Sequence, residues 1–431
     1  MAKHPVAWRR IAVGYRRQNG RGLSLASLQP DLAEGKQNGK GLVKFLIVNT
    51  DYSQFLSELY ARQPGLSEQS FAEQLRIRYA TRFGVADFYS RNLRAVGHEA
   101  LDVYVNNIAM QRVWVKEFGA MKSQKRSAFD RLIDRLWQET DRPIIRYARP
   151  LMRSWFGQDD EGCRILAAQV EHHRPDVFLN QAMDGIDGRW LKGIKPRVRL
   201  LVGQHAATSL PDHGDYSCYD LVVSSFPPTV EFFQRKGIPA VLHRLGFDPE
   251  VLLPKAEQER SYPVTFVGSL SAVHRSRIEW LEQLCALVPE LRIWGPGADL
   301  LDTSSPLRGR HMGVVWGNEM YDILLRSQIT LNHHGDVAPY ANNCRLFEAT
   351  GAGTMLLTDW KANLQDMFDV GREVAAYRTV EDCAQMIRHY LDHEDDRRTM
   401  ARAGQTRTFR DHTYRIRMQE LVEIVHKRMA A

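Results

Sequence analysis

The chain has 431 residues, 44% hydrophobic and 25% charged, a composition typical of a folded globular protein. No apolar run approaches the roughly 18 residues that a membrane-spanning helix needs. No stretch near the N-terminus has the apolar core of a secretory signal. Five scattered cysteines without a Cys-x-x-Cys pair favour free thiols in a reducing compartment. We therefore expect a cytoplasmic protein of two or three domains.

Most of the net charge of +7 lies at the N-terminus, where residues 1–42 contain eight basic and two acidic residues. The rest of the chain is nearly neutral, which argues against nucleic acid as the main partner. We interpret residues 1–42, rich in Gly, Arg and Gln, as a disordered basic arm. The alternative is that the native chain starts at Val43 and that these residues do not belong to it.

Residues 43–253 show the α/β alternation of a Rossmann-like domain. Strands are expected over 44–49, 101–105, 175–180, 198–202, 219–224 and 240–243, and helices over 53–62, 68–82, 165–170 and 229–236. A segment at 107–160 interrupts the alternation and carries eleven basic and five acidic residues from Arg112 to Arg153. It is either an ordinary helical insertion or a surface for an anionic acceptor or membrane.

Residues 254–412 repeat the α/β pattern after a polar linker at 254–263 that has proline at both ends. Strands are expected over 264–267, 291–294, 329–332 and 355–357. Helices are expected over 275–287, after a cap at Asn318, over 380–391 and over 395–403. Residues 413–431 form a final amphipathic helix.

The stretch from Asn343 to Asp359 is typical of a loop, a short helix, a turn and a buried strand. Asn342 or Asn343 is the expected N-cap, and Gly351 to Gly353 are expected to end the helix. Arg345 and Glu348 are three residues apart and share one helix face. A helix N-terminus beside an Arg attracts anions, and a carboxylate suits a pair of hydroxyls. A nucleotide presents a phosphate followed by a ribose.

The order of the whole stretch is more specific than the Arg/Glu pair alone. A strand at 329–332, His333-His334, Asn-x-Arg-x-Phe-Glu-Ala, Gly-x-Gly, an apolar strand and Thr358-Asp359 follow one another. This order resembles the donor site of GT-B glycosyltransferases, and among them the CgeB-like, group 1 type. The resemblance is strong over about residues 315–425 and continues in layout back to Lys44.

The resemblance implies two doubly wound, parallel-sheet Rossmann-like domains that face each other across a cleft. Residues 43–253 would be the acceptor domain, residues 254–412 the nucleotide-sugar donor domain, and residues 413–431 a helix that returns to the first domain. Glu348 would bind the ribose hydroxyls. Many relatives carry a second Glu eight residues earlier, where this chain has Tyr340, so the role of that carboxylate cannot be transferred.

Further site residues follow from the same resemblance and from their positions at strand ends. Arg345, the N–H groups around Asn343, and Gly268-Ser269 with Arg275 are candidates for binding the diphosphate. His205 resembles a strand-end His that contacts the donor sugar in retaining enzymes, and it is the catalytic candidate. Asn332 and His333 are expected to line the sugar site. The chain has no Asp-x-Asp metal motif, so we expect neither a metal nor a cofactor beyond the nucleotide-sugar co-substrate.

The sequence thus predicts a metal-independent glycosyltransferase, retaining by resemblance, that moves a sugar to a hydroxyl of a glycan, lipid-linked or protein acceptor. Such a role belongs to polysaccharide or glycoconjugate biosynthesis, in the cytoplasm or at the inner face of an anionic membrane. Two alternatives stay open. A sugar-nucleotide epimerase of the same architecture would need acid/base carboxylates and histidines around the sugar. A catalytically silent nucleotide-sugar binding protein would tolerate Tyr340.

Removal of residues 1–42 should leave folding and donor binding intact, because this segment precedes the first core strand and lacks apolar periodicity. Calorimetric melting of a chain that begins at Val43 measures the effect. Loss of the cooperative thermal transition would contradict the interpretation as a dispensable arm.

Overall fold

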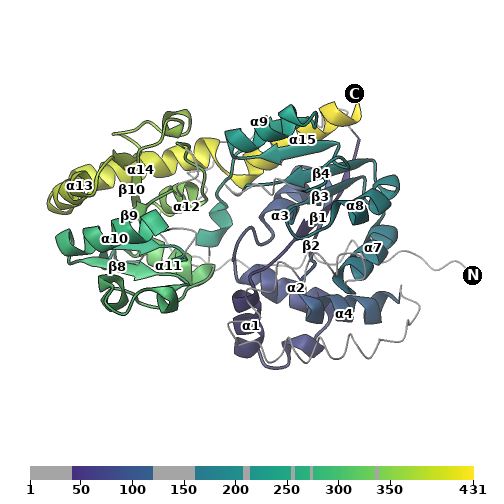
Figure 1. Cartoon of the computed structure of the whole chain (residues 1–431), viewed down its shortest axis with the longest axis horizontal. Coiled ribbons are helices and arrows are strands. Elements are labelled where there is room, and N and C mark those ends of the chain that lie inside the picture. Colours follow the sequence, from purple (N-terminus) through teal and green to yellow (C-terminus); the bar gives the residue numbers. More distant parts are fainter. Residues whose placement is uncertain (1–40, 120–160, 207–213, 254–257, 272–274, 335–338) are drawn as a thin grey trace, which may run out of the picture. The chain divides into compact units, whose positions relative to one another are not determined.

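Two parallel sheets, one in each half of the sequence, organise the chain (Figure 1). The computed structural model describes residues 41–119, 161–206, 214–253, 258–271, 275–334 and 339–431. The predicted arm and most of the predicted insertion at 107–160 lie outside these residues. Residues 42–431 form one compact unit. We call residues 42–253 the N-terminal lobe and residues 258–412 the C-terminal lobe.

The sheet of the N-terminal lobe has the strand order β2-β1-β3-β4-β5-β6, with every pair parallel. Its strands are β1 (Lys44–Asn49), β2 (Glu99–Tyr104), β3 (Val177–Asn180), β4 (Leu200–Gln204), β5 (Leu221–Ser224) and β6 (Ala240–Leu242). Strands β3, β4 and β5 are buried along their whole length. Such continuous apolar runs are expected where helices cover both faces of a parallel sheet.

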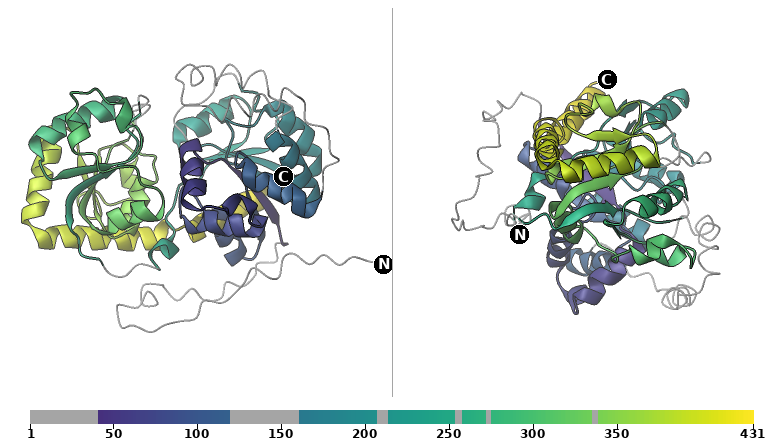
Figure 2. Two further views of the ribbon diagram at one scale, coloured as in Figure 1. Left: turned by 90° about the horizontal axis from the view of Figure 1, so that it is seen from below. Right: turned by 90° about the vertical axis from the view of Figure 1, so that its left-hand side faces the viewer.

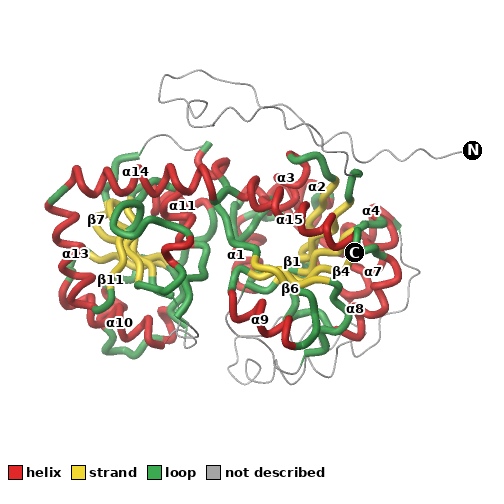
Figure 3. The backbone as a smooth tube through the Cα atoms, turned by 90° about the horizontal axis from the view of Figure 1, so that it is seen from above, coloured by secondary structure: helices red, strands yellow, loops and turns green. Residues whose placement is uncertain are grey.

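Helices surround this sheet in Figures 2 and 3. They are α1 (Ser53–Arg62), α2 (Phe71–Ala80), α3 (Phe88–Ala95), α4 (Ile108–Phe118), α7 (Glu161–His173), α8 (Gly188–Ile194) and α9 (Pro227–Arg235). Helix α2 begins later than predicted because Leu66–Glu68 form a separate 3-10 turn. The Ser70 hydroxyl then caps α2 by accepting from the Glu73 amide at 3.2 Å.

The sheet of the C-terminal lobe has the order β11-β10-β9-β7-β8 and is also parallel. Its strands are β7 (Tyr262–Val267), β8 (Leu291–Trp294), β9 (Ser327–Asn332), β10 (Met355–Asp359) and β11 (Ala375–Tyr377). Its helices are α10 (Arg275–Leu287), α11 (Asn318–Leu325), α12 (Arg345–Gly351), α13 (Val380–Asp392) and α14 (Glu394–Asp411). The predicted linker is shorter than expected, because β7 already begins at Tyr262.

The predicted start of α11 and the predicted end of α14 are wrong. Helix α11 begins at Asn318 itself, and Gly317 is its N-cap. The side-chain amide of Asn318 does not cap the helix but donates to the Ala80 carbonyl. Helix α14 continues to Asp411 instead of ending near Ala403. Its later buried positions are Gly404 and Thr408, and small or polar residues at these positions give no apolar signal.

The last helix, α15 (Tyr414–Met429), packs against α3 of the N-terminal lobe. The ring of Tyr414 lies 5.5 Å from that of Tyr89, and Arg428 Nε donates to the Asp220 carbonyl at 2.9 Å. Helices α14 and α15 follow each other at the yellow end of the chain in Figure 1. The chain therefore leaves the second sheet and ends on the first.

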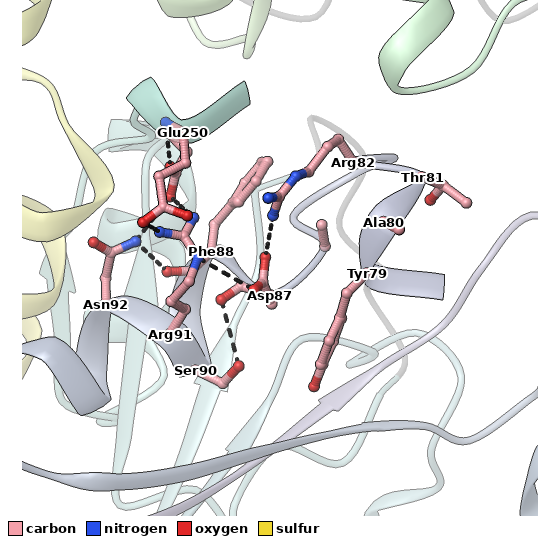
Figure 4. A network of polar contacts seen from close by, with 12 residues as sticks. Tyr79, Ala80, Thr81, Arg82, Asp87, Phe88, Ser90, Arg91, Asn92 and Glu250 are labelled. Atoms are coloured by element: carbon pink, nitrogen blue, oxygen red, sulfur yellow. Dashed lines mark hydrogen bonds and ion pairs between the residues drawn. The ribbon is translucent and has the colours of Figure 1, made fainter. Parts of the chain in front are cut away.

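A polar network attaches α3 to the segment after β6 (Figure 4). The Arg91 guanidinium bridges Asp87, Asp248 and Glu250. Asn92 Nδ2 also donates to Asp248, at 2.9 Å. Because Asp248 is buried, this network holds the segment after β6 against α3.

A loop of the C-terminal lobe binds directly to the N-terminal lobe. Gly317 has φ +46°, and a Cβ there would lie 1.9 Å from the Thr81 carbonyl oxygen. The main-chain N–H of the neighbouring Asn318 donates to that same oxygen at 2.9 Å. Trp316 packs against Phe55, with ring centroids 6.1 Å apart, and its Nε1 donates to Glu58 at 3.0 Å. Only glycine permits so close an approach of the two backbones.

Asp102 is a buried carboxylate in the core of the N-terminal lobe. It accepts hydrogen bonds from Asn49 Nδ2 at 3.3 Å and from the Tyr79 hydroxyl at 2.9 Å. Burial raises the pKa of the Asp102 carboxyl to about 6, although hydrogen bonds from Ser90 and Tyr79 act in the opposite direction. The folded protein therefore holds this proton more tightly than the unfolded chain does.

Asp102→Asn should stabilise the protein at neutral pH. The wild-type carboxyl is neutral in both states only well below its ordinary pKa of 3.8, and its contribution to stability is lost as the pH rises from there to about 6. The difference in unfolding free energy between variant and wild type should rise over this window and level off at about 3 kcal/mol. Urea unfolding at pH 4, 5, 6 and 7 measures it. A difference that does not change with pH would contradict this prediction.

Gly317→Ala should destabilise the protein, because a Cβ would collide with the Thr81 carbonyl as well as adopt a left-handed φ. Gly84→Ala is the matched control, since Gly84 has φ +59° and open space around it. The control should cost about 1 kcal/mol, from the backbone alone. Gly317→Ala should cost at least about 2 kcal/mol more. Equal losses in urea unfolding would show that the two backbones are not in tight contact.

Candidate active site

The predicted site helix α12 begins at Arg345 and is only seven residues long. Neither Asn342 nor Asn343 caps it. Cys344 is the N-cap, and the two asparagine amides bind other groups. At its other end Gly353 has φ +68°, so the predicted glycine turn is confirmed. Because so short a helix has a weak dipole, the positive charge in this region comes mainly from Arg345.

Arg345 and Glu348 form a half-buried ion pair, with Nη1 and Oε2 2.9 Å apart and side chains 12% and 14% exposed. The same guanidinium donates to the Val267 carbonyl at 3.1 Å and to Met320 Sδ at 3.2 Å. The pair is therefore fixed at the carboxyl end of β7, directly before Gly268. The negative charge of Glu348 adds to burial in raising the pKa of the Cys344 thiol to about 12.

Gly268 lies where two loops touch through their backbones. Its amide donates to the Trp294 carbonyl at 2.9 Å, and a Cβ on Gly295 would lie 2.1 Å from the Gly268 oxygen. Gly295 has φ +135° and cannot readily carry a side chain. The ends of β7 and β8 are thereby held together beside Arg345.

Arg275 does not join this group. It is 86% exposed and binds Glu279 at 3.0 Å on the surface of α10. Arg277, which sequence reasoning missed, is buried and donates to the carbonyls of Ser269 at 3.3 Å and His333 at 2.9 Å. The signal was present in the sequence: residues 277, 280, 281 and 284 form one inward helical stripe, and Arg277 begins it.

Asn332 and His333 both lie at the end of β9, but their side chains contact different groups. Asn332 is 3% exposed and donates to Thr358 Oγ1 at 2.9 Å. The His333 ring packs against Trp280 with centroids 5.1 Å apart, and burial lowers its pKa. The first therefore belongs to a buried network, and the second packs against α10.

His334 and Asp359 were not singled out from the sequence. The ring Nδ1 and the main-chain amide of His334 both bind Asp359 Oδ1, at 2.7 and 3.0 Å. Burial acts to raise the pKa of the Asp359 carboxyl, but the hydrogen bond and charge of His334 hold it well below its ordinary value. Lys361 Nζ lies 3.3 Å from the other carboxylate oxygen. Asp359 is thus an ionised, buried anchor at the end of β10.

His205 lies at the end of β4, 5% exposed, with Nε2 3.4 Å from Asp184 Oδ1. The carbonyl of the next residue, Ala206, accepts from Asn342 Nδ2 at 2.8 Å. The structure therefore brings the predicted His of the N-terminal lobe next to the loop before α12. This loop also carries Tyr340, whose ring lies perpendicular to that of Phe226 at 6.2 Å.

A pocket opens between the ends of β5 and β6 and the loop before α12. Its polar lining residues are Ser225, Arg244, Asn342, Asn343, Asn363 and Asp366. Arg244 and Asp366 pair across it at 3.5 Å. Among the described residues no three His, Cys, Asp or Glu side chains are grouped so as to hold a metal ion. None of the described helices is both long enough and apolar enough to cross a membrane.

Comparison with known proteins agrees with this geometry. Residues 275–423 match the protein family described as glycosyl transferase-like. The protein has the GT-B fold and a glycosyl transferase-like domain. The search of curated proteins found no match. The family match and the fold together indicate a transferase enzyme of the glycosyltransferase class.

Several solved structures share the fold of this GT-B protein at low sequence identity. A glycosyltransferase from Rickettsia africae has a TM-score of 0.53 at 10% identity, with 91% of this chain and 99% of that one covered. Sucrose-phosphate synthase from Thermosynechococcus elongatus has a TM-score of 0.51 at 10% identity, with 90% and 99% covered. HepE from Anabaena, solved with UDP and glucose, has a TM-score of 0.51 at 12% identity, with 89% and 100% covered.

Proposed function

We propose that the protein transfers a sugar from a nucleotide-sugar donor to a hydroxyl group of an acceptor. The observation that carries this proposal is the Arg345–Glu348 pair, held at the end of β7 within the glycosyl transferase-like domain. The solved HepE structure binds UDP and glucose, which supports a nucleotide sugar as the ligand.

The two side chains suit the two ends of a nucleoside diphosphate. A ribose diol donates two hydrogen bonds, and a carboxylate such as that of Glu348 can accept both. A guanidinium such as that of Arg345 can bind the diphosphate through several N–H groups at once. In this structure the two groups bind each other, so an arriving nucleotide would replace one ion pair with two charged contacts.

The finer features of the reaction belong to the same proposal. The acceptor hydroxyl is that of a glycan, a lipid-linked sugar or a protein, and transfer retains the anomeric configuration, as in the CgeB-like, group 1 type. Arg345 stabilises the leaving diphosphate without a metal. His205, at the end of β4, contacts the donor sugar from the N-terminal lobe. The eleven basic residues between Arg112 and Arg153 would attract the protein to an anionic membrane at its cytoplasmic side.

Two other functions predict different products. A panel of UDP-, GDP-, dTDP- and CMP-sugars is incubated with the protein without an acceptor, and the products are separated by chromatography. A transferase should slowly release free sugar and nucleotide, because water can replace the acceptor. An epimerase would interconvert the sugars, and a silent binding protein would leave them unchanged. Either of the last two results would contradict the proposal.

Glu348→Gln should weaken nucleotide binding far more than it weakens the fold. An amide accepts with only one atom, and hydrogen bonds to charged groups contribute about 1.5–3 kcal/mol each. We therefore expect at least a tenfold loss of affinity for the nucleoside diphosphate of the active donor, measured by titration calorimetry. The melting temperature without ligand should change little.

Glu279→Gln is the matched control, since Glu279 also pairs with an arginine on its own helix but does so at the surface. This variant should bind the nucleotide like the wild type. If Glu348→Gln also binds like the wild type, Glu348 is only a partner of Arg345 and the site assignment is wrong.

A further inference from the structure

A chain of hydrogen bonds leads from Asp359 to the side chain of Asn343. His334 Nδ1 binds Asp359 Oδ1 at 2.7 Å, and Asn332 Nδ2 lies 3.4 Å from His334 Nε2. The same Asn332 nitrogen donates to Thr358 Oγ1 at 2.9 Å, and that hydroxyl donates to Asp359 Oδ1 at 3.3 Å. Asn343 Nδ2 then donates to Asn332 Oδ1 at 2.7 Å.

The carboxylate fixes the polarity of every group in this chain. An ionised Asp359 can only accept, so His334 Nδ1 directs a hydrogen toward it. The Thr358 hydroxyl gives its hydrogen to Asp359 and can therefore only accept from Asn332. Asn332 Nδ2 is thus held by an acceptor, which leaves Asn332 Oδ1 to accept from Asn343.

The remaining polar atom, Asn343 Oδ1, is an acceptor. Its orientation is set by the hydrogen bond from Asn343 Nδ2 to Asn332. It is buried and has no hydrogen-bond partner among the described residues. Ser225, from the other lobe, lines the same pocket, and its hydroxyl is likewise buried without a described partner. A buried polar atom without a partner is unfavourable, so a ligand that satisfies both groups is favoured.

The chemistry of the two groups selects the ligand. A carbonyl oxygen repels phosphate and carboxylate oxygens and attracts an O–H donor. A serine hydroxyl can donate or accept, and a sugar hydroxyl can do the same. Neighbouring sugar hydroxyls would therefore satisfy Asn343 and Ser225 together.

The position of Asn343 agrees with a sugar as the occupant. Asn343 lines the pocket two residues before α12 begins, and Arg345 and Glu348 follow it within the helix. If Glu348 binds the ribose and Arg345 the diphosphate, the next group of a nucleotide sugar is the sugar. The Asn342 amide, bound to the Ala206 carbonyl, places this loop beside His205 as well.

We infer that the Asn343 side-chain oxygen accepts a hydrogen bond from a hydroxyl of the transferred sugar, and that Asn332 and Thr358 are positioning residues for it. The inference rests on the proposed function. Asn343 is then a specificity residue that distinguishes the nucleotide sugar from the nucleotide alone, whereas Glu348 recognises the nucleotide that both ligands share.

The test compares two affinities in one protein. The donor is the nucleotide sugar in the panel that gives the largest rise in melting temperature, and its partner ligand is the matching free nucleoside diphosphate. Asn343→Ala should weaken binding of the nucleotide sugar about fivefold to tenfold, the value of one neutral hydrogen bond. Binding of the free nucleotide should stay unchanged. Glu348→Gln should weaken both.

Thr358 provides the test of positioning. Thr358→Val keeps the shape of the side chain but removes the acceptor that holds Asn332, so the Asn332 and Asn343 amides can turn over. The affinity for the nucleotide sugar, divided by the affinity for the free nucleoside diphosphate, should fall toward the value found for Asn343→Ala. Thr358→Ser keeps the hydroxyl and should restore the wild-type ratio, which a purely structural role of the threonine methyl group would not allow.

The outcomes separate the inference from the proposed function. If no nucleotide sugar binds to the wild type, the proposed function is wrong and the inference falls with it. If Glu348→Gln weakens both ligands while Asn343→Ala weakens neither, or both equally, the function stands and the inference is overturned. If Asn343→Ala does not fold, the comparison of the Thr358 variants decides the question.

Discussion

The parallel pairing of every strand in both sheets is the constraint on which the site depends. Parallel strands of one sheet all end at the same edge. The residues that follow β4 and β5 in the first sheet, and β7, β9 and β10 in the second, are therefore brought together although they are far apart in the sequence. His205, Ser225, Gly268, His333 and Asp359 each lie at or just after such an end. The interiors of the strands are mostly buried and apolar, with Asp102 in β2 an exception, and the candidate site lies at the strand ends.

Within this edge, one buried carboxylate orders the groups around it. Asp359 remains ionised because His334, Thr358 and Lys361 surround it. A buried charge that lacked such partners would be neutralised by a shift in its pKa. The cost of burying the Asp359 charge is offset by the hydrogen bonds that it accepts. These hydrogen bonds also set the orientation of the His334 and Asn332 side chains.

Much of the architecture was predictable because buried parallel strands leave continuous apolar runs, as at Val264–Val267 and Met355–Leu357. The α/β class and the Arg345–Glu348 face followed from such local spacing, and the GT-B architecture followed from the resemblance of the 329–359 stretch to known glycosyltransferases. The N-caps at Asn318 and Asn343 were predicted wrongly because each amide binds a residue distant in the sequence, Ala80 or Asn332. The role of Asp359 was missed for the same reason, because its partners are brought to it by the tertiary structure. The role of Arg277 was missed although the helical stripe that it begins is visible in the sequence.

The docking of the loop around Gly317 onto Thr81 has a consequence for how the chain would respond to cutting. The two lobes are joined by the covalent segment near residue 254, by α15 on α3, by this backbone contact, and by side-chain contacts such as that of Asn342 with Ala206. A protease that cleaved the segment between the lobes would leave two fragments still bound by the non-covalent connections. The nicked protein would migrate as one particle under native conditions and as two bands after denaturation. Neither half should be regarded as an independently folding domain, because separation would expose Trp316 and the surface of α3 to water.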